Sequence, residues 1–305
     1  MNVSVHAVVV IYKPDLQVLH EELRLLHTQV SHIWLMINAD YDDIRNWAQS
    51  FTFKPELSCV DMKGNQGIGT ALNRGFQLLR DAHAEYALIL DQDSLIKPNM
   101  VNLLLIEARR LCSKDIPVAL LAPRYSSGSD MPLSSFVRHG WLGNQYLNEE
   151  QVQKQSAVEI DFAISSGSLI PMAAISAIGP MDEGLFIDHV DTEWCLRARS
   201  MGYKLFGVSA AHMIHTLGDN RLRIWWLRWR SVPYHSSFRY YYILRNSIIL
   251  QKRSYVSTKW HIGEFFRCFR VVLFYTLFAK NRRENLQMML KGIQHGIKGL
   301  NGPIV

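Results

Sequence analysis

The stretch YALILDQDS at residues 86–94 decides the fold class, because a short apolar run ends directly in two carboxylates. An apolar run of this length, bounded by polar residues, predicts a buried strand. Three similar runs come before it, at residues 5–12, 32–38 and 57–62. Segments with helical character separate these runs, at residues 15–30, 42–50 and 70–82. Strands that alternate with helices predict an α/β sandwich with a mostly parallel sheet.

The pattern continues less regularly beyond residue 94. We expect a helix over residues 97–112, a strand over 118–122, strand structure within 157–171, a helix ending at Arg199 and a strand over 203–208. Residues 125–156 are polar without a clear period, so we expect a flexible excursion there. The composition turns basic and aromatic near residues 216–222, which suggests a domain boundary.

Composition excludes several classes of protein. The chain has 305 residues, of which 48% are hydrophobic and 20% charged, as in ordinary globular proteins. Its four cysteines are widely spaced without a CxxC pair, so neither a disulfide framework nor a cysteine zinc site is expected. A reducing cytosolic compartment fits this usage. We expect no signal peptide and no membrane-spanning helix.

Charge is distributed unevenly along the chain. Residues 216–305 contain 16 Lys and Arg against three acids, a net charge of +13, while the whole chain carries +6. Trp225, Trp226, Trp229, Trp260 and the run FFRCFRVVLFYTLF at residues 265–278 lie in the same part. Arginines among aromatic residues suit an anionic membrane interface. The alternative is a helical subdomain with a solvated basic face, and no nucleic-acid-binding motif is visible.

Asp91 and Asp93 stand two positions apart at the end of the predicted strand. Two carboxylates on such a turn can reach one divalent cation, which can offset the charge of a diphosphate. Their position matters because ligands of open α/β sheets bind beyond the carboxyl ends of the strands. The alternative is a pair of helix caps ahead of Pro98.

Two further segments carry candidate binding groups. GNQGIGTALNRG at residues 64–75 links a strand to a helix, where glycines permit close approach and free N–H groups can meet an anion. A plain strand-to-helix turn is the alternative. FIDHVDTEW at residues 186–194 gathers three acids and a histidine, so one acid is a candidate general base, unless these acids are helix caps. His215 is a candidate metal ligand or an ordinary packing residue.

Taken in order, these segments resemble the inverting glycosyltransferases of family 2, which have the GT-A fold. VVVIYKP, GNQGIGTALNRG, LDQDS and GPMDEGLFIDHVDTEWCLRARSMGYKLFGVSAAHMIH match the family pattern over residues 5 to about 250. DQDS and FIDHVDTEWCLRA are most similar to bacterial rhamnosyltransferases of surface polysaccharides such as O-antigen. The resemblance implies a Rossmann-like GT-A sandwich with a mixed, mostly parallel sheet and a C-terminal helical region.

The resemblance also implies roles for individual residues. Asp91, Asp93 and His215 would hold Mg²⁺ or Mn²⁺. Asp191 would be the catalytic base, but Val190 replaces the first acid of the family's acidic pair, which leaves Asp188 as a rival base. The nucleotide sugar would be bound by Tyr12, Asn38, Asp40, Asn65, Gly67, Asn73, Asp91, Gln92, Asp93 and Arg245. The acceptor would be bound by Gly167, Asp188 and Trp194.

The implied function is transfer of L-rhamnose from dTDP-β-L-rhamnose to a lipid-linked oligosaccharide acceptor. Residues 1–218 would form the catalytic domain, with the nucleotide-sugar part at 1–95 and the acceptor part at 96–218. Residues 219–305 would form a mainly helical region on an anionic membrane surface, which places the protein in the cytoplasm at the inner face of the bacterial cytoplasmic membrane. A homo-oligomer is left open, and no nucleic-acid partner is expected.

Three other readings compete with this one. The first is a galactofuranosyl- or hexosyltransferase that uses a UDP-sugar, since the same fold and metal site would serve. The second is a nucleotidyltransferase, which would typically need a glycine-rich basic loop near the N-terminus that IYKP at residues 11–14 does not supply. The third is a membrane-surface scaffold with an inactive GT-A fold.

Overall fold

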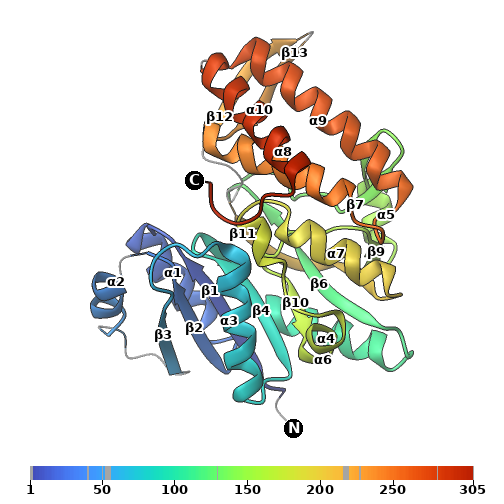
Figure 1. The fold of residues 1–305 in the computed structure, drawn as a ribbon. Coiled ribbons are helices and arrows are strands. Elements are labelled where there is room, and N and C mark those ends of the chain that lie inside the picture. The colour runs from blue at the N-terminus through green and yellow to red at the C-terminus, as the bar shows by residue number, and fades with distance from the viewer. Residues whose placement is uncertain are drawn as a thin grey trace.

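The computed structural model describes residues 3–39, 41–49, 51, 56–128, 130–215, 220–226, 228–279 and 281–304. Its centre is a nine-stranded sheet with the order β3-β2-β1-β4-β10-β6-β11-β5, and β9 pairs with β11 (Figure 1). The strands are β1 (Val5–Ile11), β2 (His32–Ile37), β3 (Glu56–Asp61), β4 (Tyr86–Asp91), β5 (Ser94–Ile96), β6 (Val118–Ser126), β9 (Ala157–Ile160), β10 (Leu169–Pro171) and β11 (Lys204–His215).

The sheet is mixed, as expected. The pairs β3-β2, β2-β1, β1-β4 and β6-β11 are parallel. β10 runs antiparallel between β4 and β6, and β5 and β9 run antiparallel to β11. The four parallel strands at one edge all end on the same side of the molecule, which is where the polar residues that follow them gather.

Side chains of β1 show why this strand is apolar without interruption. All seven of its residues are buried. Successive side chains of a strand point to opposite faces, so Val8 and Val10 pack on one side while Val9 and Ile11 pack on the other. A strand covered by helices on both faces needs apolar residues at every position.

Helices cover both faces of the sheet. One face packs against α3 (Ile68–Asp81), α6 (Met172–Ile178) and α7 (Val190–Ser200). The other packs against α1 (Leu16–Leu26), α2 (Tyr41–Ala48) and α4 (Met100–Cys112). Asp15 caps α1, because its carboxylate accepts hydrogen bonds from the backbone N–H groups of Gln17 and Val18 at 2.9 and 3.3 Å. The helices α1, α2, α3, α4 and α7 match expected ones within a few residues, whereas α6 was not predicted.

The expectation of a flexible excursion over residues 125–156 is wrong. Apart from Ser129, which is not described, this segment continues β6 to Ser126 and then forms the hairpin of β7 (Val137–Gly140) and β8 (Gly143–Tyr146), followed by α5 (Glu149–Gln153). Asn148 and Gln151 form a capping box that starts α5. The strands are only four residues long, too short for a period of two to stand out in the sequence.

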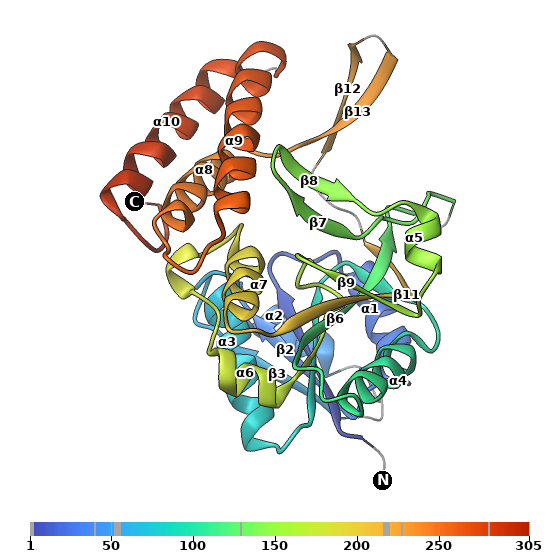
Figure 2. The ribbon, with the colours of Figure 1, turned by 90° about the vertical axis from the view of Figure 1, so that its right-hand side faces the viewer.

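The C-terminal part contains the hairpin of β12 (Asn220–Trp226) and β13 (Arg228–Tyr234) and three helices, α8 (Ser237–Gln251), α9 (Thr258–Phe278) and α10 (Arg282–Lys298). Figures 1 and 2 show these helices gathered at one end of the molecule, beyond the sheet. Among the described residues, no helix is both long enough and apolar enough to cross a membrane. The side chains of Trp225, Trp226 and Trp229 lie outside the described part, as do residues 216–219 at the expected boundary.

Candidate active site

A cleft of 650 Å³ opens where the parallel strands end and α8 and α9 approach the sheet. Ten of the residues singled out in the sequence line it: Tyr12, Asn38, Asn65, Gly67, Asp91, Gln92, Asp93, Asp188, Asp191 and His215. The strand-end argument therefore located the cleft correctly. Asp40 lies outside the described residues.

Asp91, Asp93 and His215 meet because of strand pairing. Asp91 ends β4, and the antiparallel pairing of β5 with β11 places His215 opposite Ser94. His215 Nδ1 lies 3.2 Å from Asp93 Oδ1, and His215 Nε2 lies 3.8 Å from Asp91 Oδ2. Asp91 and Asp93 thus share one corner of the cleft with His215, although more than 120 positions separate them from it in the sequence.

The electrostatics of this corner favour a positive charge. Burial raises the pKa of Asp91, and the charge of Asp93 raises it further, while His215 opposes the shift. Burial alone would lower the pKa of His215, but its hydrogen bond to Asp93 and the charges of both aspartates raise it. A carboxylate whose pKa is raised by a neighbouring carboxylate is stabilised in its charged form by a cation between the two.

Donor chemistry and spacing at this corner fit a divalent cation in part. Metal–ligand bonds of about 2.0–2.2 Å let two donors of one ion lie up to about 4.2 Å apart, which accommodates Asp91 and His215. Asp93 instead hydrogen-bonds His215 directly. Across the described residues, no three His, Cys, Asp or Glu side chains are already arranged as a complete cation site. Cation binding would therefore replace the hydrogen bond between His215 and Asp93.

The acidic segment forms a strained loop that α8 holds in place. Phe186, Asp188 and His189 have positive φ angles of 64, 60 and 63°, a region that costs free energy for residues other than glycine. Asn246 of α8 donates hydrogen bonds from Nδ2 to the carbonyls of Leu185, Ile187 and Asp188, at 2.8–3.0 Å. The loop leads into α7, whose first turn carries Asp191 at the cleft.

Asp188 and Asp191 line the same cleft but differ in their partners. Asp188 forms an ion pair with Arg239 of α8, with 2.7 Å between Oδ1 and Nη2. Asp191 has no cationic partner among the described residues, and its Oδ1 accepts a hydrogen bond from the Thr192 N–H at 2.7 Å. Burial raises the pKa of Asp191 to about 6, and the charges of Asp188 and Asp91 add to that shift. A carboxylate with such a pKa suits proton transfer near neutral pH.

Side-chain amides at the ends of the parallel strands form a hydrogen-bond network in the wall of the cleft. Asn38 accepts a hydrogen bond from the Gln66 N–H at 2.8 Å and donates to Asn65 at 3.2 Å. The side-chain amide of Gln92 pairs with the backbone of Tyr12, at 2.6 and 2.8 Å. Gln92 therefore ties the end of β1 to the turn that carries both aspartates.

Arg245 does not line the cleft, contrary to the expectation from the YYxxRN element. Its side chain is fully buried and donates hydrogen bonds to the carbonyls of Gly184, Leu185 and Gly302, at 3.2, 2.8 and 2.5 Å. The guanidinium fills the hydrogen-bonding needs of two chain segments. Arg245 thus holds together α8, the acidic loop and the C-terminal segment.

Three further expected site residues also lie away from the cleft lining. Asn73 bridges α3 to residues 181–183 by hydrogen bonds with the Met181 backbone at 2.8 and 3.0 Å. Trp194 is buried and donates a hydrogen bond to the carbonyl of Gly179 at 3.0 Å. Gly167 has a φ of 80°, and a Cβ there would lie 2.6 Å from the sulfur of Met213. These three residues therefore make structural contacts and do not belong to the lining of the cleft.

Five residues that were not expected at the site line the cleft from the C-terminal helices and the segment before them: His235, Phe238, Arg239, Ile243 and Arg267. The excess of positive charge after residue 216 was the signal for Arg239 and Arg267, because it indicated an anionic partner. No spacing rule distinguished the two arginines that face the cleft from the others in this part.

Comparisons with known proteins bear on the family and the fold of this chain. A family model described as Glycosyl transferase family 2 matches residues 7–179, which is more than half of the chain. A curated relative, the dTDP-rhamnosyl transferase RfbF of Shigella flexneri, is 28% identical over 313 residues, covering 99% of this chain and 98% of that protein.

Two solved structures share the fold. S. aureus TarS 1–349 in complex with UDP-GlcNAc has a TM-score of 0.59 and 14% identity, over 97% of this chain and 81% of that one. GalNAc-T7 with UDP, GalNAc and Mn²⁺ has a TM-score of 0.57 and 12% identity, over 91% of this chain and 58% of that one. At this identity, the likeness establishes the expected α/β fold of GT-A type.

Proposed function

Since this chain belongs to glycosyl transferase family 2, we propose that it transfers L-rhamnose from dTDP-β-L-rhamnose to a saccharide hydroxyl with inversion of configuration. The alignment with a dTDP-rhamnosyl transferase over nearly the whole chain supports this donor. The observation that carries the reaction type is Asp191, a carboxylate with a pKa of about 6 that lines the cleft without a cationic partner among the described residues.

In the proposed reaction, the oxygen of the acceptor hydroxyl attacks the anomeric carbon while Asp191 accepts the proton of that hydroxyl. The new carbon–oxygen bond forms on the face opposite the departing nucleoside diphosphate, so one displacement converts the β-linked donor into an α-L-rhamnoside. A positioned base of this kind supplies about 10²–10⁴-fold in rate. Asp188 is the weaker candidate for the base, because Arg239 already holds it in an ion pair.

The donor would occupy the end of the cleft that carries the strand-end amides. Asn38, Asn65 and Tyr12 offer hydrogen-bonding groups and an aromatic ring for the nucleotide. Asp91, Asp93 and His215 would hold Mg²⁺ or Mn²⁺, which when bound supplies charge neutralisation for the leaving diphosphate. Arg239 adds a fixed positive charge on the opposite wall, from α8.

The acceptor is proposed to be lipid-linked and reached at the inner face of the bacterial cytoplasmic membrane, in O-antigen-type polysaccharide synthesis. α9 supports this with large apolar side chains that are 49–65% exposed: Phe265, Phe269, Leu273 and Leu277. Apolar side chains together with a basic surface favour binding to anionic lipid. We propose peripheral association, with the oligomeric state left to measurement.

A donor screen tests the proposal. The purified protein is incubated with dTDP-rhamnose or UDP-sugars, with Mg²⁺ or Mn²⁺, and the nucleoside diphosphate released is identified. Release of dTDP from dTDP-rhamnose, lost in Asp191→Asn, is the expected result. Release of UDP alone would replace rhamnose transfer by a hexosyl- or galactofuranosyltransferase reaction. A chelator that leaves turnover unchanged would refute the metal requirement.

Membrane association is tested by flotation with liposomes that contain phosphatidylglycerol, at physiological salt. The full-length protein should float with these vesicles and not with neutral ones. Phe265→Ser combined with Phe269→Ser should weaken flotation, because both side chains are more than half exposed and contribute little to the core. Undiminished flotation of this variant would exclude α9 as the lipid-binding face.

A further inference from the structure

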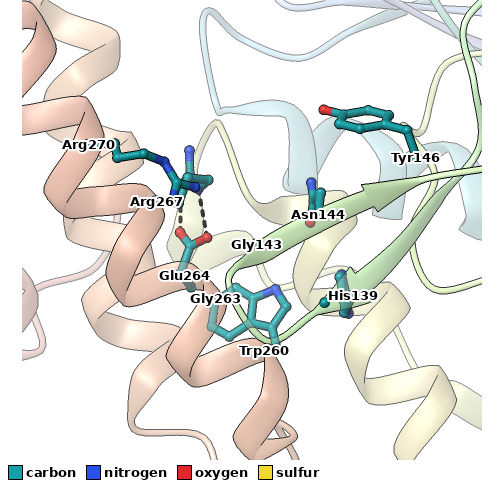
Figure 3. A pocket seen from close by; sticks show the side chains of 10 residues that line it. His139, Gly143, Asn144, Tyr146, Trp260, Gly263, Glu264, Arg267 and Arg270 are labelled. Carbon is teal, nitrogen blue, oxygen red and sulfur yellow. Dashed lines mark hydrogen bonds and ion pairs between the residues drawn. The ribbon is translucent and has the colours of Figure 1, made fainter.

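A second, smaller pocket of 190 Å³ lies between the β7–β8 hairpin and α9 (Figure 3). His139, Asn144 and Tyr146 line it from the side of the hairpin. Trp260, Glu264, Arg267 and Arg270 line it from α9. None of the expected catalytic, substrate-binding or metal-binding residues lies among them, although Trp260, Arg267 and Arg270 belong to the part expected at a membrane surface.

Close backbone contact fixes the two walls of this pocket. A Cβ at Gly263 of α9 would lie 3.1 Å from the carbonyl oxygen of Gly140 and 3.2 Å from the nitrogen of Gly143. The hairpin backbone therefore rests directly on the helix, at a distance where a larger residue would force the hairpin to shift by a few tenths of an ångström. The pocket beside this contact is a built feature of the fold.

The charges around the pocket leave a surplus positive charge. Arg267 is paired with Glu264, with 2.7 Å between Nε and Oε2. Burial alone would raise the pKa of Glu264, but the charge and hydrogen bonds of Arg267 lower it to about 2. Glu264 is therefore ionised, and its pair with Arg267 is neutral overall. Arg270 forms no ion pair with any described carboxylate, and its one described hydrogen bond, to the Leu142 carbonyl, is long at 3.4 Å.

The arrangement of these groups is typical of an anion site. Arg267 and Arg270 are three positions apart, which places two like charges on one face of α9. An anion beside both guanidinium groups would neutralise the unpaired charge of Arg270 and accept N–H groups from both arginines, and phosphate geometry suits this best. Across the pocket, the buried Nδ1 of His139 has no hydrogen-bond partner in the described part of the chain.

This pocket adjoins the candidate active site. Arg267 lines both cavities. Its Nη2 donates a hydrogen bond to His189 Nε2 at 3.0 Å, and His189 precedes Asp191 by two positions. A group bound in the pocket is thus separated from the loop of the candidate base by one side chain.

We propose that this pocket binds a phosphate or diphosphate group of the acceptor, and that the attached saccharide reaches from there into the cleft towards Asp191. The inference rests on the proposed function, because it assigns the second substrate of the same reaction. Trp141 and Leu142, which are 59% and 73% exposed at the tip of the hairpin, stand beside the pocket. They are suitably placed to contact a lipid attached to that phosphate.

Calorimetric titration of the full-length protein with inorganic pyrophosphate, without added metal, tests the pocket. Arg270→Gln should weaken pyrophosphate binding at least 10-fold. Asn144→Asp, which adds a negative charge to the opposite wall, should weaken it as well. Arg282→Gln is the matched control, because it removes an exposed charge at the start of α10, away from the pocket, and should stay within twofold of the wild type.

Three results would overturn the proposal: no binding by the wild-type protein, equal binding by Arg270→Gln, or equal weakening by Arg282→Gln. Farnesyl diphosphate identifies the source of the phosphate. Binding at least 10-fold tighter than that of pyrophosphate indicates a lipid-linked group, whereas equal binding supports the pocket with a phosphate group that is not attached to lipid.

Binding of dTDP with Mn²⁺ to the same variants separates this proposal from the proposed function. If the wild type and Arg270→Gln bind dTDP equally while pyrophosphate affinity is unchanged, the phosphate pocket is refuted and the donor assignment stands. If dTDP does not bind the wild type, but Arg270→Gln still weakens pyrophosphate binding, the donor assignment fails and the anion site stands.

Discussion

Asp188 and Arg239 form an ion pair across the cleft, with Oδ1 and Nη2 2.7 Å apart. The pair joins the acidic loop before α7 to the first turns of α8, which lie 51 positions apart in the sequence. It has a chemical consequence, because it occupies the acid that competes with Asp191 for the role of base. The ion pair does not cancel the effect of Asp188 on its neighbour. The charge of Asp188 still helps to raise the pKa of Asp191.

Asp188→Asn is therefore expected to keep turnover within about tenfold of the wild type, because the proposed base is still present. Removal of the neighbouring negative charge lowers the pKa of Asp191. The acid limb of the pH–rate profile should accordingly move to lower pH. A loss of about 10²–10⁴-fold, as for removal of a general base, would instead make Asp188 the base.

Wild-type turnover should rise with pH through about 6, because Asp191 must lose its proton to act as a base and burial raises its pKa to about 6. Asp191→Asn should remove this limb and cost about 10²–10⁴-fold in rate, with dTDP binding retained. Rate measurements between pH 5 and 9 on both proteins check this. A variant that keeps near-wild-type turnover would show that Asp191 is not the base.

The same substitution should stabilise the protein at high pH. The folded-state pKa of Asp191 is above its ordinary value of 3.8, so its ionisation opposes folding. This penalty is fully present above pH 6 and absent below about pH 4, so Asp191→Asn should gain on the order of 2 kcal/mol at pH 8 and almost nothing at pH 4. Urea unfolding at the two pH values measures the difference. Equal gains at both would contradict a charge effect.

Much of the fold and part of the site follow from local sequence signals. Asp91, Asp93 and Asn38 could be located because they directly follow apolar strands, and ligands bind at that edge of the sheet. Arg245 and Trp194 were expected at the site but do not line the cleft. A sequence motif locates a residue in the chain but does not say whether its side chain points into the cleft or into the core. Arg239 and Arg267 could not be identified, since their place depends on how α8 packs against the acidic loop and α9 against the β7–β8 hairpin.

Arg245→Gln tests whether that arginine is structural. It would remove the side-chain donor of the Gly302 carbonyl and one of the donors of the Gly184 and Leu185 carbonyls, which should destabilise the protein by about 1–3 kcal/mol. Arg253→Gln, which removes a half-exposed ion pair with Asp182, is the control and should cost less than about 1 kcal/mol. Unchanged stability of Arg245→Gln with a large rise in the donor KM would restore the expected contact with the diphosphate.

Gly67 and Gly64 offer a matched pair of variants that tests the contact between the loop after β3 and the acidic loop. Both have positive φ angles, of 83 and 93°, so alanine is strained at either position. At Gly64 a Cβ would meet nothing within 4 Å, whereas at Gly67 it would lie 2.7 Å from the carbonyl oxygen and the ring of Phe186. Phe186 begins the acidic loop, so Gly67→Ala displaces that loop and Gly64→Ala does not.

Gly64→Ala should therefore lose only about 1–2 kcal/mol of stability, with turnover little changed. Gly67→Ala should lose more stability and also lower kcat, because the displaced loop carries Asp188 and leads to Asp191. Urea unfolding and steady-state rates at saturating donor measure the two effects separately. If both variants lose stability equally and keep kcat, the contact between the strand-end loop and Phe186 does not position the base, and only the hydrogen bonds from α8 would then hold it.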